Sequence, residues 1–253
     1  MGLIKKETFI CLDLETTGLE PENDRIIEVA AVCFTFDTTL NTFESLIDPE
    51  IPISEVSKAI HHISDEMVQG KPKIAEVLPA LLKMIDRHII VGHSVGMDIA
   101  FLSAAARRHN IPNILSAIAY FDTLRLARLY GESPTNSLEK LREHFNIESE
   151  GAHRAMSDVI VNIEVFKYLS TNFQTTKQLF DRLKMPILLK TMPLGKHKGR
   201  LFSEIPIEYL LWAARKDFDQ DLLFSIRSEI NKRKAGKQFG QASNPFASLL
   251  GDE

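Results

Sequence analysis

The chain carries carboxylates at a spacing that could hold metal ions. Asp13 and Glu15 stand two residues apart at the end of residues 8–14, an apolar and β-branched run. Side chains alternate along a strand with a period of two, so both carboxylates point from the same face. Neighbouring carboxylates resist ionisation unless a cation lies between them, and Mg²⁺ and Mn²⁺ favour such oxygen ligands. The pair therefore indicates either a cation site or two carboxylates solvated at a strand end.

Two further acids and a histidine could take part in the same chemistry. Asp98 falls in the first turn of a predicted helix, where the helix dipole alone favours an acid. Asp158 falls on a later predicted helix beside apolar Ala155 and Val159, where an unpaired acid is costly. His153 comes five residues before Asp158, about 500° of helical rotation, so we expect it to precede the helix. Taken singly, each of these residues is explained more simply as a surface residue.

The joint pattern of these residues is more specific than any one of them. Three motifs occur in order: Asp13-Leu14-Glu15-Thr16-Thr17-Gly18, then Gly92-His93 followed by Asp98, Phe101 and Leu102, then His153-Arg154-Ala155 followed by Asp158. Together they resemble the motifs of the DEDD exonuclease superfamily, histidine subclass, and are most similar to those of the epsilon proofreading subunits of bacterial DNA polymerase III. The resemblance spans about residues 7–175.

This resemblance implies a role for each matching residue. The implied ligands of two Mg²⁺ or Mn²⁺ ions are Asp13, Glu15, Asp98 and Asp158. The implied general base is His153, and the implied substrate contacts are Thr16, Gly18, His61 and His93. The implied activity is hydrolysis of phosphodiester bonds at DNA 3′ ends, single strands preferred, with release of nucleoside monophosphates in replication proofreading or repair.

The chain departs from the family pattern at two positions. Met97 precedes Asp98 where relatives usually have an aromatic residue, and His62 follows His61 where they favour glycine. Neither departure removes a predicted ligand.

Hydrophobic periodicity predicts the elements that position these residues. Strands are expected at 8–14, 25–36, 40–47, 88–92 and 117–121, and helices at 74–86, 98–109, 122–130, from Ser137 onward, and at 155–169. Pro79 should kink the first of these helices or mark its true start. Three strands in a meander, followed by strands alternating with helices, indicate a mixed α/β sheet. The family resemblance implies a ribonuclease-H-like five-stranded mixed sheet flanked by helices.

We expect four regions along the chain. They are an exonuclease domain at 1–175, a linker at 176–186, a small and mainly helical basic module at 187–230, and a flexible tail at 231–253. Residues 192–212 resemble a small uncharacterised module that accompanies some exonucleases. Lys196, Lys198 and Arg200 lie in a basic turn there, which we interpret as a contact for single-stranded nucleic acid; the alternative is a solvated turn.

Charge divides the chain unequally. The net charge is −4, yet residues 176–253 carry 14 Lys and Arg against 9 Asp and Glu, so the remainder is strongly acidic. The basic end could attract phosphate. Cys11 and Cys33 each lie in an apolar run and are predicted to be buried, unpaired thiols.

Targeting and partners are predicted on weaker signals. Residues 1–7 hold no apolar run of the kind found in signal peptides, and no stretch approaches the roughly 20 apolar residues of a membrane span, so we expect a cytoplasmic protein. Proofreading would require a DNA polymerase partner. Residues 241–246 resemble peptides that dock on sliding clamps but lack their central leucine, and a plain tail is the alternative. Two alternative functions are an exoribonuclease that trims RNA 3′ ends and a non-catalytic nucleic-acid-binding or polymerase-binding module; loss of a ligand would favour the second.

Overall fold

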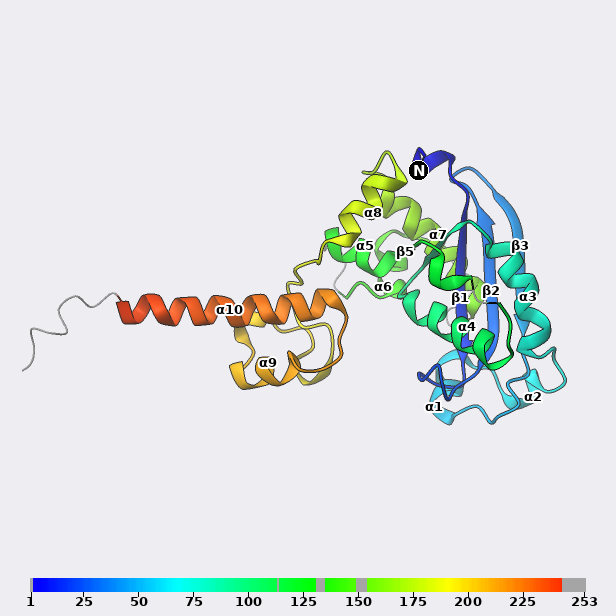
Figure 1. Ribbon diagram of the computed structural model, residues 1–253, viewed down its shortest axis with the longest axis horizontal. Coiled ribbons are helices and arrows are strands. Elements are labelled where there is room, and N and C mark those ends of the chain that lie inside the picture. The colour runs from blue at the N-terminus through cyan, green and yellow to red at the C-terminus, as the bar shows by residue number, and fades with distance from the viewer. Residues whose placement is uncertain (1, 113, 131–134, 149–153, 243–253) are drawn as a thin grey trace, which may run out of the picture. The chain divides into compact units, whose positions relative to one another are not determined.

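The computed structural model describes residues 2–112, 114–130, 135–148 and 154–242, without the side chains of 236–242. The chain divides into two compact units, residues 1–183 (unit 1) and residues 184–253 (unit 2). Each unit has its own buried cluster of apolar side chains, and we describe the two separately (Figure 1).

Unit 1 is built on one five-stranded mixed sheet. Its strands are β1 (Phe9–Thr16), β2 (Ile26–Phe34), β3 (Thr39–Leu46), β4 (Ile89–Gly92) and β5 (Tyr120–Asp122), in the order β3-β2-β1-β4-β5. The first three strands pair antiparallel, whereas β4 runs parallel to β1 and β5 parallel to β4. The predicted meander and the ribonuclease-H-like mixed sheet are both confirmed.

Helices cover both faces of this sheet. The helices of unit 1 are α1 (Glu55–His61), α2 (Asp65–Val68), α3 (Ile74–Ile85), α4 (Gly96–Arg108), α5 (Thr123–Tyr130), α6 (Leu138–His144), α7 (Ala155–Ser170) and α8 (Thr176–Lys184). Short 3-10 turns lie at Ile4–Lys6 and Leu115–Ala117. Helices α3 and α4 pack on one face, and α5 to α8 on the other (Figure 1).

The alternation of β1 divides its side chains between these two layers. Leu12 and Leu14 are buried in the cluster with α3 and α4, whereas Phe9 and Cys11 are buried in the cluster with α7. Asp13 continues the row of Phe9 and Cys11, and Glu15 follows it. The sheet therefore directs both carboxylates toward the α7 side. Both cysteines are buried and unpaired, as predicted.

Helix α3 follows the sequence-based expectation, whereas two other segments differ from it. Helix α3 begins at Ile74 and continues through Pro79, so the proline does not mark its start. Residues 176–184, expected in a linker, form α8, because Leu179 and Leu183 are spaced one turn apart and are buried in the α7 cluster. Residues 231–242, expected in a flexible tail, continue helix α10; Ile230 near this junction is still buried.

Unit 2 is a small helical unit. It contains α9 (Ile207–Ala213), α10 (Gln220–Ala242) and 3-10 turns at Gly195–His197 and Phe202–Glu204. Its core consists of Met192, Phe202, Ile205, Leu210, Ala213, Leu222, Ile226 and Ile230. Buried Asp221 accepts a hydrogen bond from the Ile187 N–H at 3.0 Å, which fixes the chain that enters the unit. No helix in the described part of the chain is long and apolar enough to cross a membrane.

Candidate active site

Three carboxylates from two elements converge at the end of β1. Oxygen atoms of Asp13 and Glu15 on β1 and of Asp158 on α7 lie within 4.8 Å of one another. Asp158 comes from the first turn of α7, whose buried neighbours Ala155 and Val159 pack against the sheet. Each of the three residues keeps part of its surface accessible. This is the size and chemistry of a site for a divalent cation.

The fourth predicted ligand, Asp98, approaches from another element. It lies in the first turn of α4, which follows β4, the strand parallel to β1. Burial raises the pKa of Asp98 to about 8, while hydrogen bonds from the backbone of Asp98 and Leu14 act against that rise. Asp98 does not belong to the 4.8 Å group of described carboxylates, but among the charged residues it has the largest effect on Asp13.

Burial and mutual repulsion both disfavour ionisation within this cluster of acids. Burial raises the pKa of Asp13 well above its usual range, and Asp98, Asp158 and Glu15 raise it further. The pKa of Glu15 is raised to about 7. Burial is the largest cause, and the charge of Asp158 is the next largest. A protein gains nothing in stability from such an arrangement without cations, since each acid disfavours ionisation of the others. The cluster is therefore built to receive positive charge.

Asp13 interacts with each of the other three acids. Asp98, Asp158 and Glu15 all raise its pKa, whereas among the acids Asp158 has the largest effect on the pKa of Glu15, and Glu15 comes last among the influences on that of Asp98. The charge state of Asp13 therefore depends on the whole cluster.

An ion pair between exposed Arg154 and buried Glu28 anchors the start of α7, and sequence reasoning missed it. Arg154 donates to Glu28 Oε1 from Nη2 at 2.6 Å and from Nε at 3.1 Å, and the Ala155 N–H donates to Glu28 Oε2 at 3.0 Å. Glu28 is 1% exposed and lies opposite Glu15 in the β1–β2 register. A lone acid within the fully buried strand Ile26–Phe34 was the signal that could have revealed it.

A second buried polar group links α7 to the turn that precedes α4. His93 Nδ1 lies 3.0 Å from Thr123 Oγ1, which donates to Asn162 Oδ1 on α7 at 2.6 Å. Burial lowers the pKa of His93 to about 4, so its imidazole is neutral near pH 7. Asp122 accepts hydrogen bonds from the N–H groups of Ser94 and Leu124. These contacts fix the β4–α4 turn relative to Asp158.

The end of β1, the loop that follows it and the end of α1 bring three more predicted residues together. Thr16 Oγ1 donates to the Gly18 carbonyl at 2.6 Å, and a Cβ on Gly18 would lie 2.4 Å from a carboxylate oxygen of Asp24. Buried His61 accepts a hydrogen bond from the Ile63 N–H at its Nδ1. Burial lowers the pKa of His61, and a hydrogen bond with the backbone of Thr16 acts the other way.

The remaining predicted residues lie elsewhere. His153 is outside the described residues, although α7 begins after it, at Ala155, as expected. The predicted clamp peptide, residues 241–246, lies almost entirely outside them too. Lys196, Lys198 and Arg200 are exposed in unit 2.

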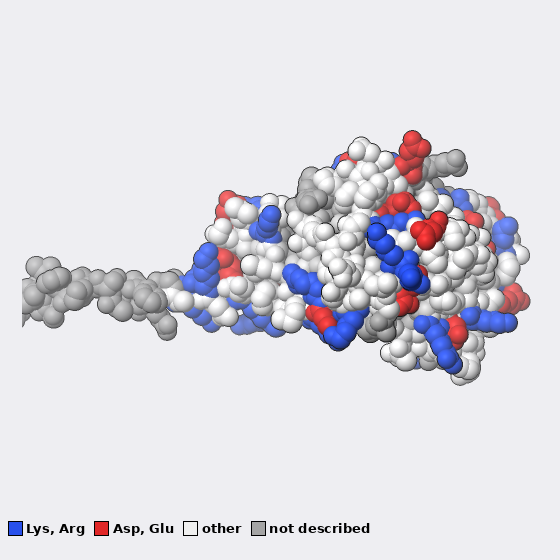
Figure 2. Space-filling model, turned by 90° about the horizontal axis from the view of Figure 1, so that it is seen from above, with Lys and Arg blue, Asp and Glu red and all other residues white. Residues whose placement is uncertain are grey.

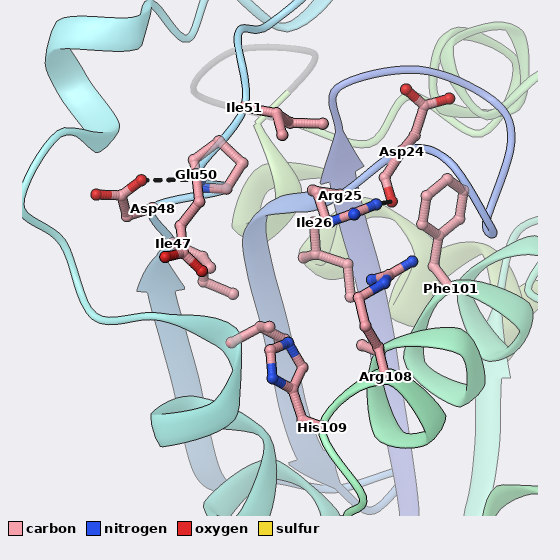
Figure 3. A pocket seen from close by; sticks show the side chains of 13 residues that line it. Asp24, Arg25, Ile26, Ile47, Asp48, Glu50, Ile51, Phe101, Arg108 and His109 are labelled. Atoms are coloured by element: carbon pink, nitrogen blue, oxygen red, sulfur yellow. Dashed lines mark hydrogen bonds between the residues drawn. The ribbon is translucent and has the colours of Figure 1, made fainter.

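A separate pocket of about 170 Å³ lies on the α4 side of the sheet (Figure 3). Ile26, Ile47 and Phe101 form its apolar wall, and Arg25 and Arg108 lie at its rim. The lining contains none of the four converging carboxylates, and Arg108 already donates to the Pro21 carbonyl. The pocket is thus distinct from the candidate active site.

Comparison with known proteins agrees with this geometry. The model of the family described as "Exonuclease" matches residues 10–166. The DNA polymerase III subunit epsilon of Aquifex aeolicus is 33% identical over 160 residues, which covers 63% of this chain and 78% of that protein. A PolC-type DNA polymerase III from Lacticaseibacillus paracasei is 35% identical over 151 residues, 59% of this chain. The match spans only 10% of that polymerase.

Solved structures share the fold of unit 1. Exonuclease X in complex with 5′-overhanging duplex DNA superimposes with a TM-score of 0.55 at 24% identity, covering 69% of this chain and 99% of that one. E. coli exonuclease I with a dA16 oligonucleotide gives a TM-score of 0.61 at 22% identity, covering 70% and 43%. In unit 2, a family model described as "Putative quorum-sensing-regulated virulence factor" matches residues 182–226.

The exonuclease match covers more than half of the chain and includes both β1 carboxylates, Asp98 and Asp158. The chain therefore belongs to the exonuclease family, as its three acidic motifs predicted.

Proposed function

We propose that Asp13, Glu15, Asp98 and Asp158 bind two divalent cations, Mg²⁺ or Mn²⁺, and that this site hydrolyses phosphodiester bonds at DNA 3′ ends, releasing nucleoside monophosphates. The approach of Asp13, Glu15 and Asp158 within 4.8 Å carries the proposal. Acids this close raise one another's pKa, and a cation is the simplest group that removes that cost. The donor set consists of carboxylate oxygens, which suits Mg²⁺ and Mn²⁺.

Each of the four acids would have its own part in binding the two cations. When bound, two cations supply an activated water and stabilise charge on the leaving oxygen. Asp13, whose pKa responds to all three other acids, would contact both cations. Glu15 and Asp158 would hold one of them, and Asp98 would hold the other together with Asp13.

His153 is proposed as the general base. A histidine with its ordinary pKa near 6.5 can take the proton of water near neutral pH. The neighbouring Arg154 is held on Glu28 at 2.6 Å, so the peptide that follows His153 is attached to the strand beside Glu15. This attachment supports a base that approaches the cluster from the start of α7.

Substrate contacts are proposed at the loop after β1. Thr16, Gly18 and His61 lie together, and the Thr16–Gly18 hydrogen bond presents a tight turn beside the carboxylates. His93 is partly buried and lies 3.0 Å from Thr123, so we propose that it orders the β4–α4 turn and contacts substrate only with the exposed edge of its ring.

DNA is the proposed substrate because the names of related proteins refer to DNA polymerase, and related structures hold DNA. The names of the relatives include subunits and PolC forms of DNA polymerase III, and the exonuclease I and exonuclease X structures contain DNA. A single-stranded 3′ end, a polymerase III partner and a cytoplasmic location are further proposals. An RNA 3′ end remains the alternative substrate, since the same acids serve both sugars.

One digestion experiment tests metal need, direction and substrate together. Full-length protein is incubated with single-stranded DNA, duplex DNA or RNA, labelled at the 3′ or the 5′ end, with Mg²⁺, Mn²⁺ or chelator. We expect immediate release of a labelled mononucleotide from 3′-labelled single-stranded DNA, a ladder of shortening products from 5′-labelled DNA, and no reaction in chelator. Preferred degradation of RNA would select the alternative substrate, and release from the 5′ end would overturn the direction.

Two variants test the residue assignments in the same assay. His153→Ala should lower kcat by about 10²–10⁴-fold if it acts as the base. Asp158→Asn should abolish metal-dependent turnover, whereas Asp37→Asn, which changes an exposed acid in the β2–β3 turn, should not. Full turnover in the Asp158 variant would remove the metal-site proposal.

A further inference from the structure

Unit 2 presents an exposed basic loop that is closed into a fixed shape. The Met192 N–H donates to the Arg200 carbonyl at 2.9 Å, and the Gly199 N–H donates to the Met192 carbonyl at 2.8 Å. Thr191 and Leu201 form an isolated antiparallel bridge at the base of the loop. Lys196, Lys198 and Arg200 are exposed within this hairpin.

Aromatic side chains connect this loop to helix α9. Gly195 has φ +72°, and a Cβ there would lie 2.9 Å from the Tyr209 hydroxyl, so the loop backbone sits against that ring. The His197 ring meets Tyr209 edge-on at 4.5 Å, and Tyr209 contacts Trp212 at 5.2 Å. The loop and the aromatic row therefore form one continuous feature, which we call the aromatic–basic surface; it consists of Lys196, Lys198, Arg200, Tyr209, Trp212 and Lys216.

The groups on this surface are available to a ligand. Trp212 is 49% exposed, and the Lys216 ammonium lies 5.0 Å from the centre of its ring. Within the described chain, Lys196, Lys198 and Arg200 make no ion pair. Residues 184–253 carry 12 Lys and Arg against 8 Asp and Glu, and basic side chains gather on the part of Figure 2 that shows unit 2.

We propose that the aromatic–basic surface binds single-stranded nucleic acid, with a base stacked on Trp212 and backbone phosphates held by the lysines and Arg200. An exposed indole offers a flat face to any unpaired base, and nearby cations follow the phosphates. A duplex buries its base faces within its own stack, so it could use the cations but not the indole. This inference goes beyond the nuclease site, because it involves no metal and none of the four carboxylates.

The single tryptophan of the chain gives a direct readout. Because Trp212 is the only tryptophan, fluorescence excited at its absorption edge reports on unit 2 alone. Full-length Asp158→Asn protein is titrated with unlabelled single-stranded oligonucleotides, dT or rU, in chelator, so that hydrolysis cannot interfere. We expect saturable quenching, with duplex DNA quenching much less. Absence of quenching by either strand at low salt would overturn the proposal.

Variants separate stacking from charge, with binding measured by anisotropy of a labelled oligonucleotide. Trp212→Ala should weaken binding about tenfold, and Trp212→Phe should recover part of that loss. Log K falls as log salt concentration rises, and replacing Lys196, Lys198 and Arg200 by glutamine should make that slope shallower by about 2. The matched control replaces exposed Lys6, Lys83 and Arg87 of unit 1 by glutamine; Lys6 precedes β1 and Arg87 precedes β4, so both lie before the starts of strands whose far ends lead to the carboxylates.

The outcomes are distinct from those of the nuclease assays. Equal losses in the unit 2 triple variant and the unit 1 control would overturn the assignment, as would unchanged affinity in Trp212→Ala with an intact thermal melt. If the wild-type protein lacked nuclease activity but oligonucleotides still quenched Trp212, the proposed function would fail and the binding proposal would stand.

Discussion

The two units concentrate charges of opposite sign, and they differ in how far these charges are exposed to solvent. Unit 1 gathers Asp13, Glu15, Asp98 and Asp158 at partly buried positions where the acids repel one another. Unit 2 spreads its cations over an exposed loop and helix around Trp212. Crowded, buried like charges are costly without a counter-ion, whereas exposed charges are well solvated and cost little.

This difference explains why one site is far easier to assign than the other. A cluster that destabilises the protein when empty requires a specific ligand, and its residue types indicate a divalent cation. A solvated basic surface needs no ligand to be stable, so only its combination with aromatic side chains indicates one.

The largest expected effect separates catalysis from strand binding. Asp158→Asn should lower kcat by at least about 10³-fold, since a lost ligand removes several kcal/mol of transition-state stabilisation. The glutamine triple variant of Lys196, Lys198 and Arg200 should raise KM on single-stranded DNA with little change in kcat. Steady-state kinetics on both proteins measure this, and a comparable loss of kcat in the triple variant would break the separation.

The next effect concerns the ion pair that anchors α7. Arg154→Met leaves the Glu28 carboxylate buried without its partner, so it should lower the free energy of unfolding by on the order of 3 kcal/mol. It should also reduce kcat about 10–100-fold, as loss of supporting contacts does around metal sites. Urea unfolding and kinetics measure the two quantities.

A double variant checks the cause of that loss. Combining Arg154→Met with Glu28→Gln removes the stranded charge and should recover much of the stability, while kcat stays low because α7 is no longer fixed. Equal stability of the single and double variants would show that the charge of Glu28 is not the reason.

A smaller effect is expected from pH in the absence of metal. The folded-state pKa of Glu15 is raised to about 7 and that of Asp98 to about 8, both above their unfolded values near 4. The folded state therefore holds more protons than the unfolded state between about pH 4 and 8, and its stability falls as the pH rises through that range.

Metal should reverse this trend. In chelator, we expect a lower Tm at pH 8 than at pH 6, and Mn²⁺ should raise Tm more at pH 8, because the cation displaces the bound protons. Thermal melts of the wild type and Asp98→Asn provide the comparison, the variant being less sensitive to pH. A metal effect independent of pH would argue against proton displacement.

The smallest effect lies at His62. Its φ is 59° in the left-handed C-cap of α1, a backbone conformation that glycine adopts at lower cost. His62→Gly should raise the free energy of unfolding by no more than about 1 kcal/mol. His62→Ala is the control, since it keeps the backbone cost while removing the ring; a gain of equal size in both would assign the effect to the ring.

Much of unit 1 could be predicted because its signals are local in sequence. The alternation of residues 8–14 predicts β1 and places Asp13 and Glu15 on one face, and the strand prediction agrees with Phe9–Thr16. Apolar residues at helical spacing predict α3, α4 and α7 within a few residues of their observed bounds. In unit 2, the glycines around Lys196 indicated the basic turn that the hydrogen bonds of Met192 close.

Contacts between distant segments could not be predicted in the same way. The bond of Arg154 to Glu28 joins residues 126 positions apart, and that of Thr123 to Asn162 joins residues 39 apart. Helix α8 was expected to be a linker because residues 172–177 are polar, whereas Leu179 and Leu183 become informative only once the α7 surface that buries them exists.

The sequence by itself determined which acids are present, their order and the strand and helices that carry them, since period and residue type are properties of a short segment. Only the tertiary structure decided that Asp158 meets Asp13 and Glu15, and that Glu28 holds the start of α7. Distances between segments depend on how sheet and helices pack, and packing is settled by the whole chain at once.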